Sequence, residues 1–78
     1  MQVQVKGVLA NGNIVTGNGA WPEGLGFFPG LEVIFAQHGV RHLGRVSAVT
    51  VDLGDSVNGR PARNPITINA TDVHEVEQ

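Results

Sequence analysis

The fold of this chain is decided by nine residues, Arg45-Val46-Ser47-Ala48-Val49-Thr50-Val51-Asp52-Leu53. Valines dominate this stretch, and their branched side chains fit the pleated surface of a strand better than the flank of a helix. Side chains alternate between the two faces of a strand, but here the alternation slips once. Val46 and Ala48 share one face, whereas the apolar residues that alternate after them lie on the other. A bulge or strong coil near Ala48 would let one strand serve both sheets of a small barrel.

The residues after this strand predict a long loop and a short closing element. Residues 54–65 include two prolines and predict a 12-residue loop. Residues 66–68 alternate between apolar and polar and predict a short strand. Thr71-Asp72 predicts the cap of a single helical or 3₁₀ turn, because these side chains accept hydrogen bonds from free amides. Val76 predicts a last short strand.

The residues before the nine-residue stretch predict a further strand with one apolar face. Glu32 points away from the three apolar side chains of that face: Leu31, Val33, Phe35. His38-Gly39 then predicts a tight turn. Elsewhere the 11 glycines and four prolines leave helices little room, so the sequence predicts an all-β chain.

An N-terminal hairpin is predicted from residues 2–9 and 13–17. Polar and apolar residues alternate in its first strand. Asn11-Gly12 supplies the positive φ angles that a tight hairpin turn requires. Gly7 lies where a bulge or a sharp bend can reset the alternation.

A glycine-rich connection, residues 17–30, carries the largest apolar side chains of the chain: Trp21, Leu25, Phe27, Phe28. These side chains either plug one end of the barrel, as large apolar groups tend to do, or form a surface for a ligand or a subunit. The sequence leaves both interpretations open.

The turns and apolar positions from Phe28 to Val76 resemble the plan of SH3-like barrels, with the turn pattern of KOW-type modules. The matching segments are Pro29-Gly30 with Val33, Gly44-Arg45-Val46, Ile66-Thr67-Ile68, and Asp72-Val73. The resemblance implies a small SH3-like barrel with an additional N-terminal hairpin. It implies one domain over residues 1–78, with the hairpin and loop in 1–28 and the barrel core in 29–78.

The strand Ile66-Thr67-Ile68-Asn69 is also similar to the Val-Gln-Ile-Tyr strand of the plasmid-borne type II dihydrofolate reductases. Those proteins are nearly as short, fold like SH3 barrels and form tetramers around one pore, where this strand contacts cofactor and folate. The two apolar positions match, whereas Thr67 and Asn69 replace the residues that contact ligands. The resemblance therefore implies a barrel and a homo-oligomer, and it assigns no catalytic residue.

The composition excludes several classes of protein. The chain has no cysteine, which rules out disulfides, cysteine-based metal sites and a thiol nucleophile. Five basic residues against seven acidic ones give a net charge of −2, which argues against nucleic-acid binding. No apolar run approaches the roughly 20 residues of a membrane helix. The first residues do not resemble a signal peptide, so we expect a cytoplasmic protein.

The residues that could support catalysis form no motif. Ser47 and Ser56 have no histidine at a recognisable spacing. Asp52 and Asp55 fit a solvated turn at least as well as an acid/base pair. We predict no catalytic residue.

His38 and His42 flank a predicted turn, across which two imidazoles could meet. Two ligands do not make a metal site. We expect two exposed histidines there, and we predict neither a metal nor a cofactor.

The loop 54–65 is the most suggestive segment for binding. Pro61 and Pro65 restrict the segment that carries Arg60 and Arg63, and a loop of reduced entropy favours recognition of a carboxylate, a phosphate or an acidic partner. A solvated connector is the alternative. The candidate residues for ligand or partner binding are Trp21, Phe27, Arg60, Arg63, Thr67 and Asn69.

These observations favour a non-catalytic binding or assembly module that associates with itself. The reason is a small core without disulfides and with exposed strand edges. A protein or small-molecule partner is open, and no membrane partner is expected. The alternatives are an enzyme with a shared active site at an oligomer interface, similar to the reductases above, and a weak KOW-like nucleic-acid binder.

Overall fold

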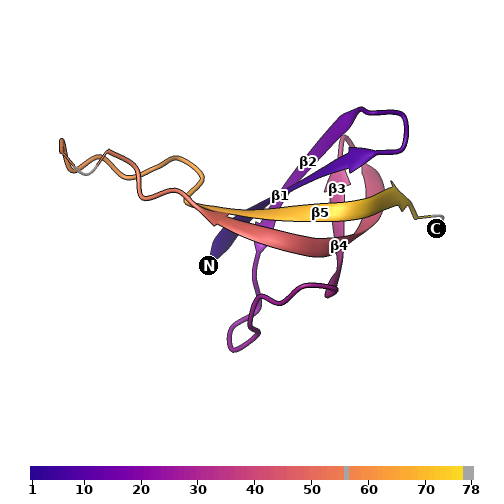
Figure 1. Cartoon of the computed structure of the whole chain (residues 1–78), viewed down its shortest axis with the longest axis horizontal. Helices are drawn as coiled ribbons and strands as arrows, with labels where there is room; N and C mark the ends of the chain where they lie inside the picture. Colours follow the sequence, from indigo (N-terminus) through magenta and orange to yellow (C-terminus); the bar gives the residue numbers. More distant parts are fainter. Residues whose placement is uncertain (56, 77–78) are drawn as a thin grey trace.

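The computed structural model describes residues 1–55 and 57–76, and the fold is all-β as the sequence predicts (Figure 1). Its strands are β1 (Gln2–Leu9), β2 (Ile14–Ala20), β3 (Glu32–Gln37), β4 (Val40–Val51) and β5 (Ile66–Glu75). The described residues form no helix, and hence none that could span a membrane.

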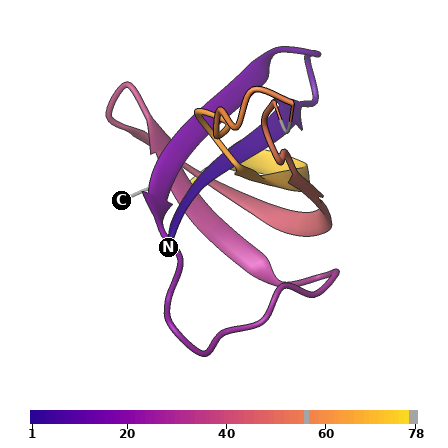
Figure 2. The same ribbon diagram turned by 90° about the vertical axis from the view of Figure 1, so that its left-hand side faces the viewer.

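The five strands form one sheet in the order β2-β1-β5-β4-β3. Neighbouring strands are antiparallel except β1 and β5, which are parallel. The sheet curls until its two outer strands, β2 and β3, approach each other (Figure 2). The predicted small barrel is therefore confirmed as a nearly closed, barrel-shaped sheet. The parallel pair β1–β5 was not predicted.

The bulge predicted near Ala48 is present in β4. The register of β4 against β5 shifts between Val46 and Ala48, and again between Leu43 and Arg45. Each irregularity adds coil to a strand, which lets the 12 residues of β4 bend around the barrel and pair with both β3 and β5. The strand is longer than predicted at its start, because it begins directly after the His38-Gly39 turn.

The predicted helical turn at Thr71-Asp72 is wrong, since β5 continues through these residues to Glu75. Asp72 has a φ of 54°, and the pairing of β5 shifts beside it on both the β1 and the β4 side. Aspartate tolerates this left-handed conformation better than most residues. A bulge therefore takes the place of the helical turn. The short strand predicted at Val76 is not a separate element: β5 ends at Glu75, and the N–H of Val76 donates to the carbonyl of Arg41 (3.0 Å).

Both predicted hairpin turns are present, although in the first of them Gly12 has a positive φ and Asn11 does not. Gly12 between β1 and β2 has a φ of 88°, and His38 and Gly39 between β3 and β4 have φ values of 52° and 80°. These positive φ angles match the right-handed twist of the paired strands. Gly7 lies at a register shift of β1 against β5, where any Cβ would collide with the side chain of Val73.

The interior of the barrel is filled by apolar side chains from every strand and by Trp21, which follows β2. Ile68 at its centre is 0% exposed. The N-terminal hairpin is an integral part of this core, because β1 and β2 contribute three of its valines. The buried members are Val3, Val5, Val15, Trp21, Phe35, Val46, Ile68, Ala70 and Val73.

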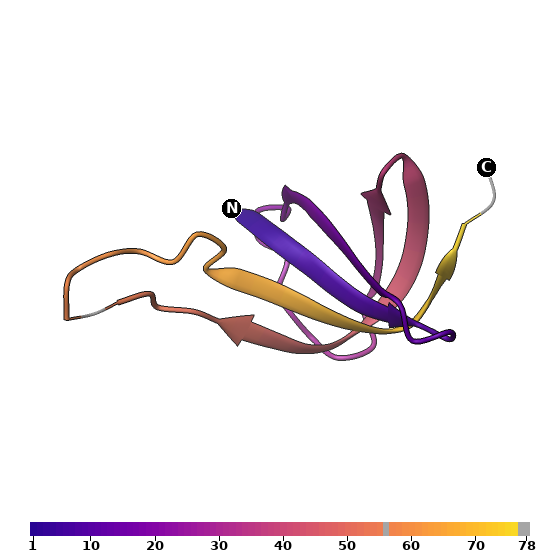
Figure 3. The same cartoon turned by 90° about the horizontal axis from the view of Figure 1, so that it is seen from above.

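One segment stands clear of the barrel. The connection between β4 and β5, residues 52–65, projects beyond the ends of these strands (Figure 3), and it accounts for the elongated dimensions of 44 × 28 × 21 Å. We call this segment the arm.

Candidate functional site

A groove opens along the seam between β2 and β3, the two outer strands of the sheet. In the described part of the chain β2 and β3 are not paired with each other in the sheet. They nevertheless meet closely at Gly17, where an added Cβ would lie 2.9 Å from the carbonyl oxygen of Ala36 and 3.1 Å from the ring of Phe35. At Gly19 an added Cβ would meet nothing within 4 Å. The seam is therefore closed at Gly17 and open beyond it.

The open part of the seam is a mostly apolar groove of about 410 Å³. Val3 and Val5 of β1 line it, as does β3 from Glu32 to Ala36. The connection between β2 and β3 supplies the other wall through Trp21, Pro22, Leu25 and Leu31. A groove of this kind can take apolar side chains from a partner.

Trp21 is fixed in the wall of this groove and is only 8% exposed. Its indole Nε1–H donates to the carbonyl of Leu25 (2.8 Å), and its backbone N–H donates to the carbonyl of Met1 (2.7 Å). The ring of Phe27 lies against it, with a centroid distance of 4.8 Å. Satisfying the indole N–H in this way lets a large ring be buried at low cost.

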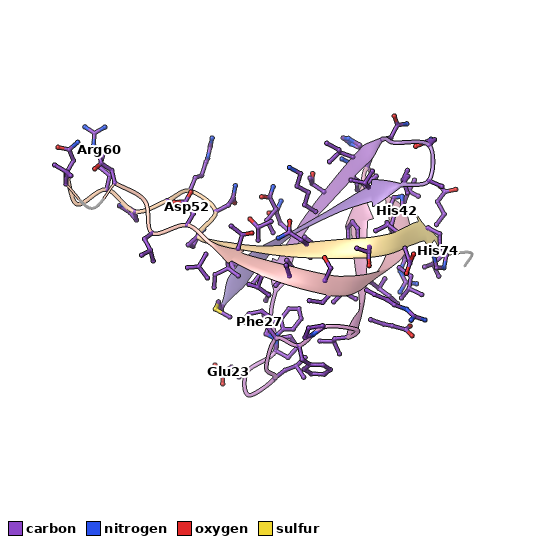
Figure 4. The ribbon with its side chains drawn as sticks, in the orientation of Figure 1. Glu23, Phe27, His42, Asp52, Arg60 and His74 are labelled. Carbon is purple, nitrogen blue, oxygen red and sulfur yellow. The ribbon has the colours of Figure 1, made fainter. Side chains whose placement is uncertain are left out.

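The sequence left open whether the aromatic connection plugs the barrel or forms a surface for a ligand or a subunit. In the structure, different side chains of the connection do each. Trp21 plugs the barrel, whereas three apolar side chains beside it are substantially exposed: Leu25, Phe27 and Phe28. Figure 4 shows Phe27 on this connection, below the sheet, with Glu23 further out on it. Sequence reasoning could not assign each residue to one class, because the assignment depends on how the loop folds over the barrel.

Two carboxylates lie at the groove or on the connection that forms its wall. Glu32 lines it, and Glu23 lies on the connection that forms its wall. Both are exposed. Arg45 lies opposite Glu32 in the register of β3 and β4, but no ion pair is present between the residues that the structure describes. The carboxylate of Glu32 therefore lies at the groove without an ion-pair partner among the described residues, and that of Glu23 lies further out on the connection.

The arm is a narrow hairpin held by backbone hydrogen bonds. At its base the N–H of Asp52 donates to the carbonyl of Pro65 (2.7 Å), and further out Asp55 and Arg60 exchange two backbone bonds (2.8 and 3.0 Å). Gly54 has a φ of 75°, and any Cβ there would collide with the carbonyl oxygen of Arg60. Only glycine permits so close an approach of the two sides.

Asp55 organises the tip of the arm. Its Oδ1 accepts from the backbone N–H groups of Val57 (3.0 Å) and Asn58 (3.1 Å), and its Oδ2 accepts from the Asn58 side chain (2.6 Å). The hydrogen bonds from Asn58 lower the pKa of the Asp55 carboxyl below its ordinary value, because they favour the charged form. At the base of the arm, Asp52 Oδ1 accepts a hydrogen bond from Gly54 N–H (2.9 Å).

The surface of the arm combines exposed apolar and basic groups. Leu53 is 82% exposed and Val57 is 90% exposed. Arg60 and Arg63 are exposed as well, and no ion pair involves them among residues 1–55 and 57–76. The carboxylates of Asp52 and Asp55 are engaged with the arm's own backbone, so the arginines remain free to meet another surface.

Thr67 and Asn69 lie on the outer face of β5, opposite the buried Ile68. Asn69 Nδ2 donates to Thr50 Oγ1 (3.0 Å) across the β4–β5 pair, and Ser47 Oγ donates to the Asn69 carbonyl (3.0 Å). Neither Thr67 nor Asn69 lines the seam groove. The structure thus brings Trp21 and Phe27 together, places Arg60 and Arg63 on the arm, and leaves Thr67 and Asn69 on a separate face.

The expectation of two exposed histidines at the β3–β4 turn is wrong for His42, which is 4% exposed. Its ring stacks on Phe35 of the neighbouring strand, with centroids 5.7 Å apart, because both side chains point into the barrel at paired positions of the hairpin. Its Nδ1 has no hydrogen-bond partner. The described residues contain no group of three or more side chains able to hold a metal.

Ser56, one of the two serines considered as nucleophiles, is not among the residues that the structure describes.

Comparisons of the chain with models of protein families, with curated proteins and with solved structures found no match in any of the three.

Proposed function

We propose that this protein is a non-catalytic assembly module that associates with copies of itself. The observation that carries the proposal is the arm, which projects from the barrel with Leu53 and Val57 almost fully exposed. Neither side chain contributes to the barrel core. Two large apolar side chains, almost fully exposed on one projection, favour a contact surface.

The construction of the arm supports the same proposal. A two-stranded hairpin without a core is marginally stable in water, yet this arm is stiffened by cross-strand bonds, two aspartate turns and two prolines. A stiff segment loses little entropy when it binds. The arm is therefore pre-organised for contact with a partner surface.

The barrel is the scaffold of this module, and we propose that it belongs to the SH3-like superfamily. Its support is the small, nearly closed sheet together with the bulge of β4 at the predicted position. We also propose a cytoplasmic location, as expected from the sequence. The assembly function does not depend on either assignment.

Sedimentation velocity over a wide range of concentration tests the proposal. The wild-type chain is expected to form oligomers, and the double variant Leu53→Ser with Val57→Ser is expected to dissociate at least about tenfold more readily, since full burial of a Leu or Val side chain is worth about 1.5 to 3 kcal/mol. The matched control is Val8→Ser with Ile14→Ser. These two residues form an exposed apolar pair on the β1–β2 hairpin.

The control variant is expected to associate as the wild type does. A wild-type chain that stays monomeric at every concentration would refute the assembly function. Equal losses in the arm variant and in the control would show that general surface hydrophobicity, and not the arm, drives association.

A further inference from the structure

We propose that the arm of one copy docks in the seam groove of a second copy, so that the chains join head to tail. This inference rests on the proposed assembly function and specifies its interface. The occupant of the groove is residues 52–65 of a neighbouring chain. The argument uses the open seam, the apolar groups on both sides, and their charges.

The first argument is the unpaired backbone at the seam. β2 and β3 end the sheet, so each presents one row of N–H and C=O groups without a strand partner. Strand edges of this kind accept an extended segment from another chain. The seam has room for one where it widens beyond Gly17, as the open space at Gly19 shows, and the arm is a projecting segment whose two sides are joined by the bridge between Asp55 and Arg60.

The second argument is the apolar match. Leu53 and Val57 on the arm need a surface that removes them from water, and the groove offers one in Leu25, Leu31 and Ile34. Leu25 and Ile34 are themselves exposed in the single chain. Burial of both sets in one contact would remove each from solvent.

The third argument is charge complementarity. Glu32 at the groove and Glu23 on the connection that forms its wall are negative, whereas Arg60 near the tip of the arm and Arg63 nearer its base are positive, and none of the four has an ion-pair partner in the described chain. The arm's own acidic groups, Asp52 and Asp55, are held by backbone amides. Opposite charges on two surfaces steer their encounter and fix the register of binding.

The contact must form between molecules. Within one chain Arg60 lies at the far end of the arm, well away from Phe27 and Glu23 beside the groove (Figure 4). One chain cannot place its arm in its own groove without breaking the β4–β5 pairing that supports the arm. Because arm and groove are different surfaces, their contact is heterologous, and such contacts build closed rings or open filaments.

A mixing experiment tests this geometry directly. The arm variant is Leu53→Asp with Val57→Asp, and the groove variant is Leu25→Asp with Ile34→Asp. All four residues are exposed, so the barrel is expected to fold in both, as circular dichroism and Trp21 fluorescence would show. The control is Val8→Asp with Ile14→Asp.

Each variant alone is expected to be monomeric, since one half of the contact is missing. An equimolar mixture is expected to give a one-to-one heterodimer that grows no further, because one intact arm meets one intact groove. If the groove variant still self-associates as the wild type does, or if the mixture stays monomeric, the head-to-tail contact is refuted. Failure of the wild type to associate would instead refute the assembly function.

Charge reversal provides a second test that does not touch apolar residues. Glu23→Lys with Glu32→Lys gives a chain whose arm and groove are both positive, and Arg60→Glu with Arg63→Glu gives one whose arm and groove are both negative. Each alone is expected to associate about tenfold more weakly than the wild type at low salt. Mixed together they are expected to regain association as alternating copies. If mixing does not restore association, the proposed pairing of arm and groove is wrong.

Discussion

The barrel and the arm of this chain are stabilised in opposite ways. The barrel depends on apolar side chains packed inside a curled sheet, with Ile68 fully buried at its centre. The arm has no interior, and it is held by backbone hydrogen bonds and by carboxylates that accept from nearby amides. The barrel's apolar residues therefore serve the fold, whereas those of the arm are available to a partner.

The largest expected effect tests this contrast by truncating one apolar side chain in each region. Ile68→Ala is expected to lower the free energy of unfolding by about 2 to 5 kcal/mol, because it leaves a cavity in the core. Leu53→Ala is expected to change it by less than about 0.5 kcal/mol, since an exposed side chain loses little packing. Urea unfolding followed by Trp21 fluorescence, at concentrations low enough for monomers, measures both. Similar losses in the two variants would show that the arm folds against the barrel.

The second prediction sharpens the comparison within the barrel, between the closed and open parts of the seam. Gly17→Ala is expected to destabilise the chain by about 1 to 3 kcal/mol, since its Cβ would press on the carbonyl of Ala36 and the ring of Phe35. Gly19→Ala meets open space and is expected to be neutral or slightly stabilising. Both variants are compared by thermal and urea unfolding. If Gly19→Ala proves as costly as Gly17→Ala, the seam is closed along its whole length.

Much of the barrel could be predicted because its signals are local. The turns at Gly12 and His38-Gly39 depend on residues that tolerate positive φ, and the bulge near Ala48 is visible as a slip in alternation. The parallel pairing of β1 with β5 has no such local signal, since the residues that it pairs are more than 50 positions apart in the sequence. The predicted helical turn at Thr71-Asp72 was wrong because an aspartate side chain suits both a helix cap and a left-handed bulge.

The candidate surfaces were harder to predict than the strands. The arginines of the loop 54–65 could be recognised from sequence, but the projection of that loop as a stiff arm depends on how β4 and β5 pair beneath it. The seam groove depends on how far β2 and β3 separate, and they are not neighbours in sequence. His42 illustrates the same limit, because its burial follows from the inward-facing position it shares with Phe35.

The smallest effect concerns the pH dependence of the arm alone. Hydrogen bonds from Asn58 hold the pKa of the Asp55 carboxyl below its ordinary value, so the charged carboxylate orders the tip at neutral pH. Because the pKa of Asp55 is lowered, its carboxylate orders the tip fully at pH values above the ordinary pKa of aspartate. This ordering is lost as the pH falls through the lowered pKa. Acidification is therefore expected to loosen the turn at Val57 and Asn58 before it affects the barrel. Asp55→Ala is expected to loosen it at every pH without moving the unfolding midpoint of the barrel.

Amide chemical shifts of Val57 and Asn58, followed by NMR through an acid titration, measure this loosening, with the amides of the β1–β2 hairpin as an internal reference. The reference amides are expected to stay unchanged over the range in which the arm responds, because residues 1–20 contain no aspartate, glutamate or histidine. If arm and reference respond together, the two regions unfold as one unit, and the contrast between them does not hold. If only the arm responds, acidification through that lowered pKa would also weaken self-association, because the docking surface would lose the pre-organisation that lowers its entropic cost of binding.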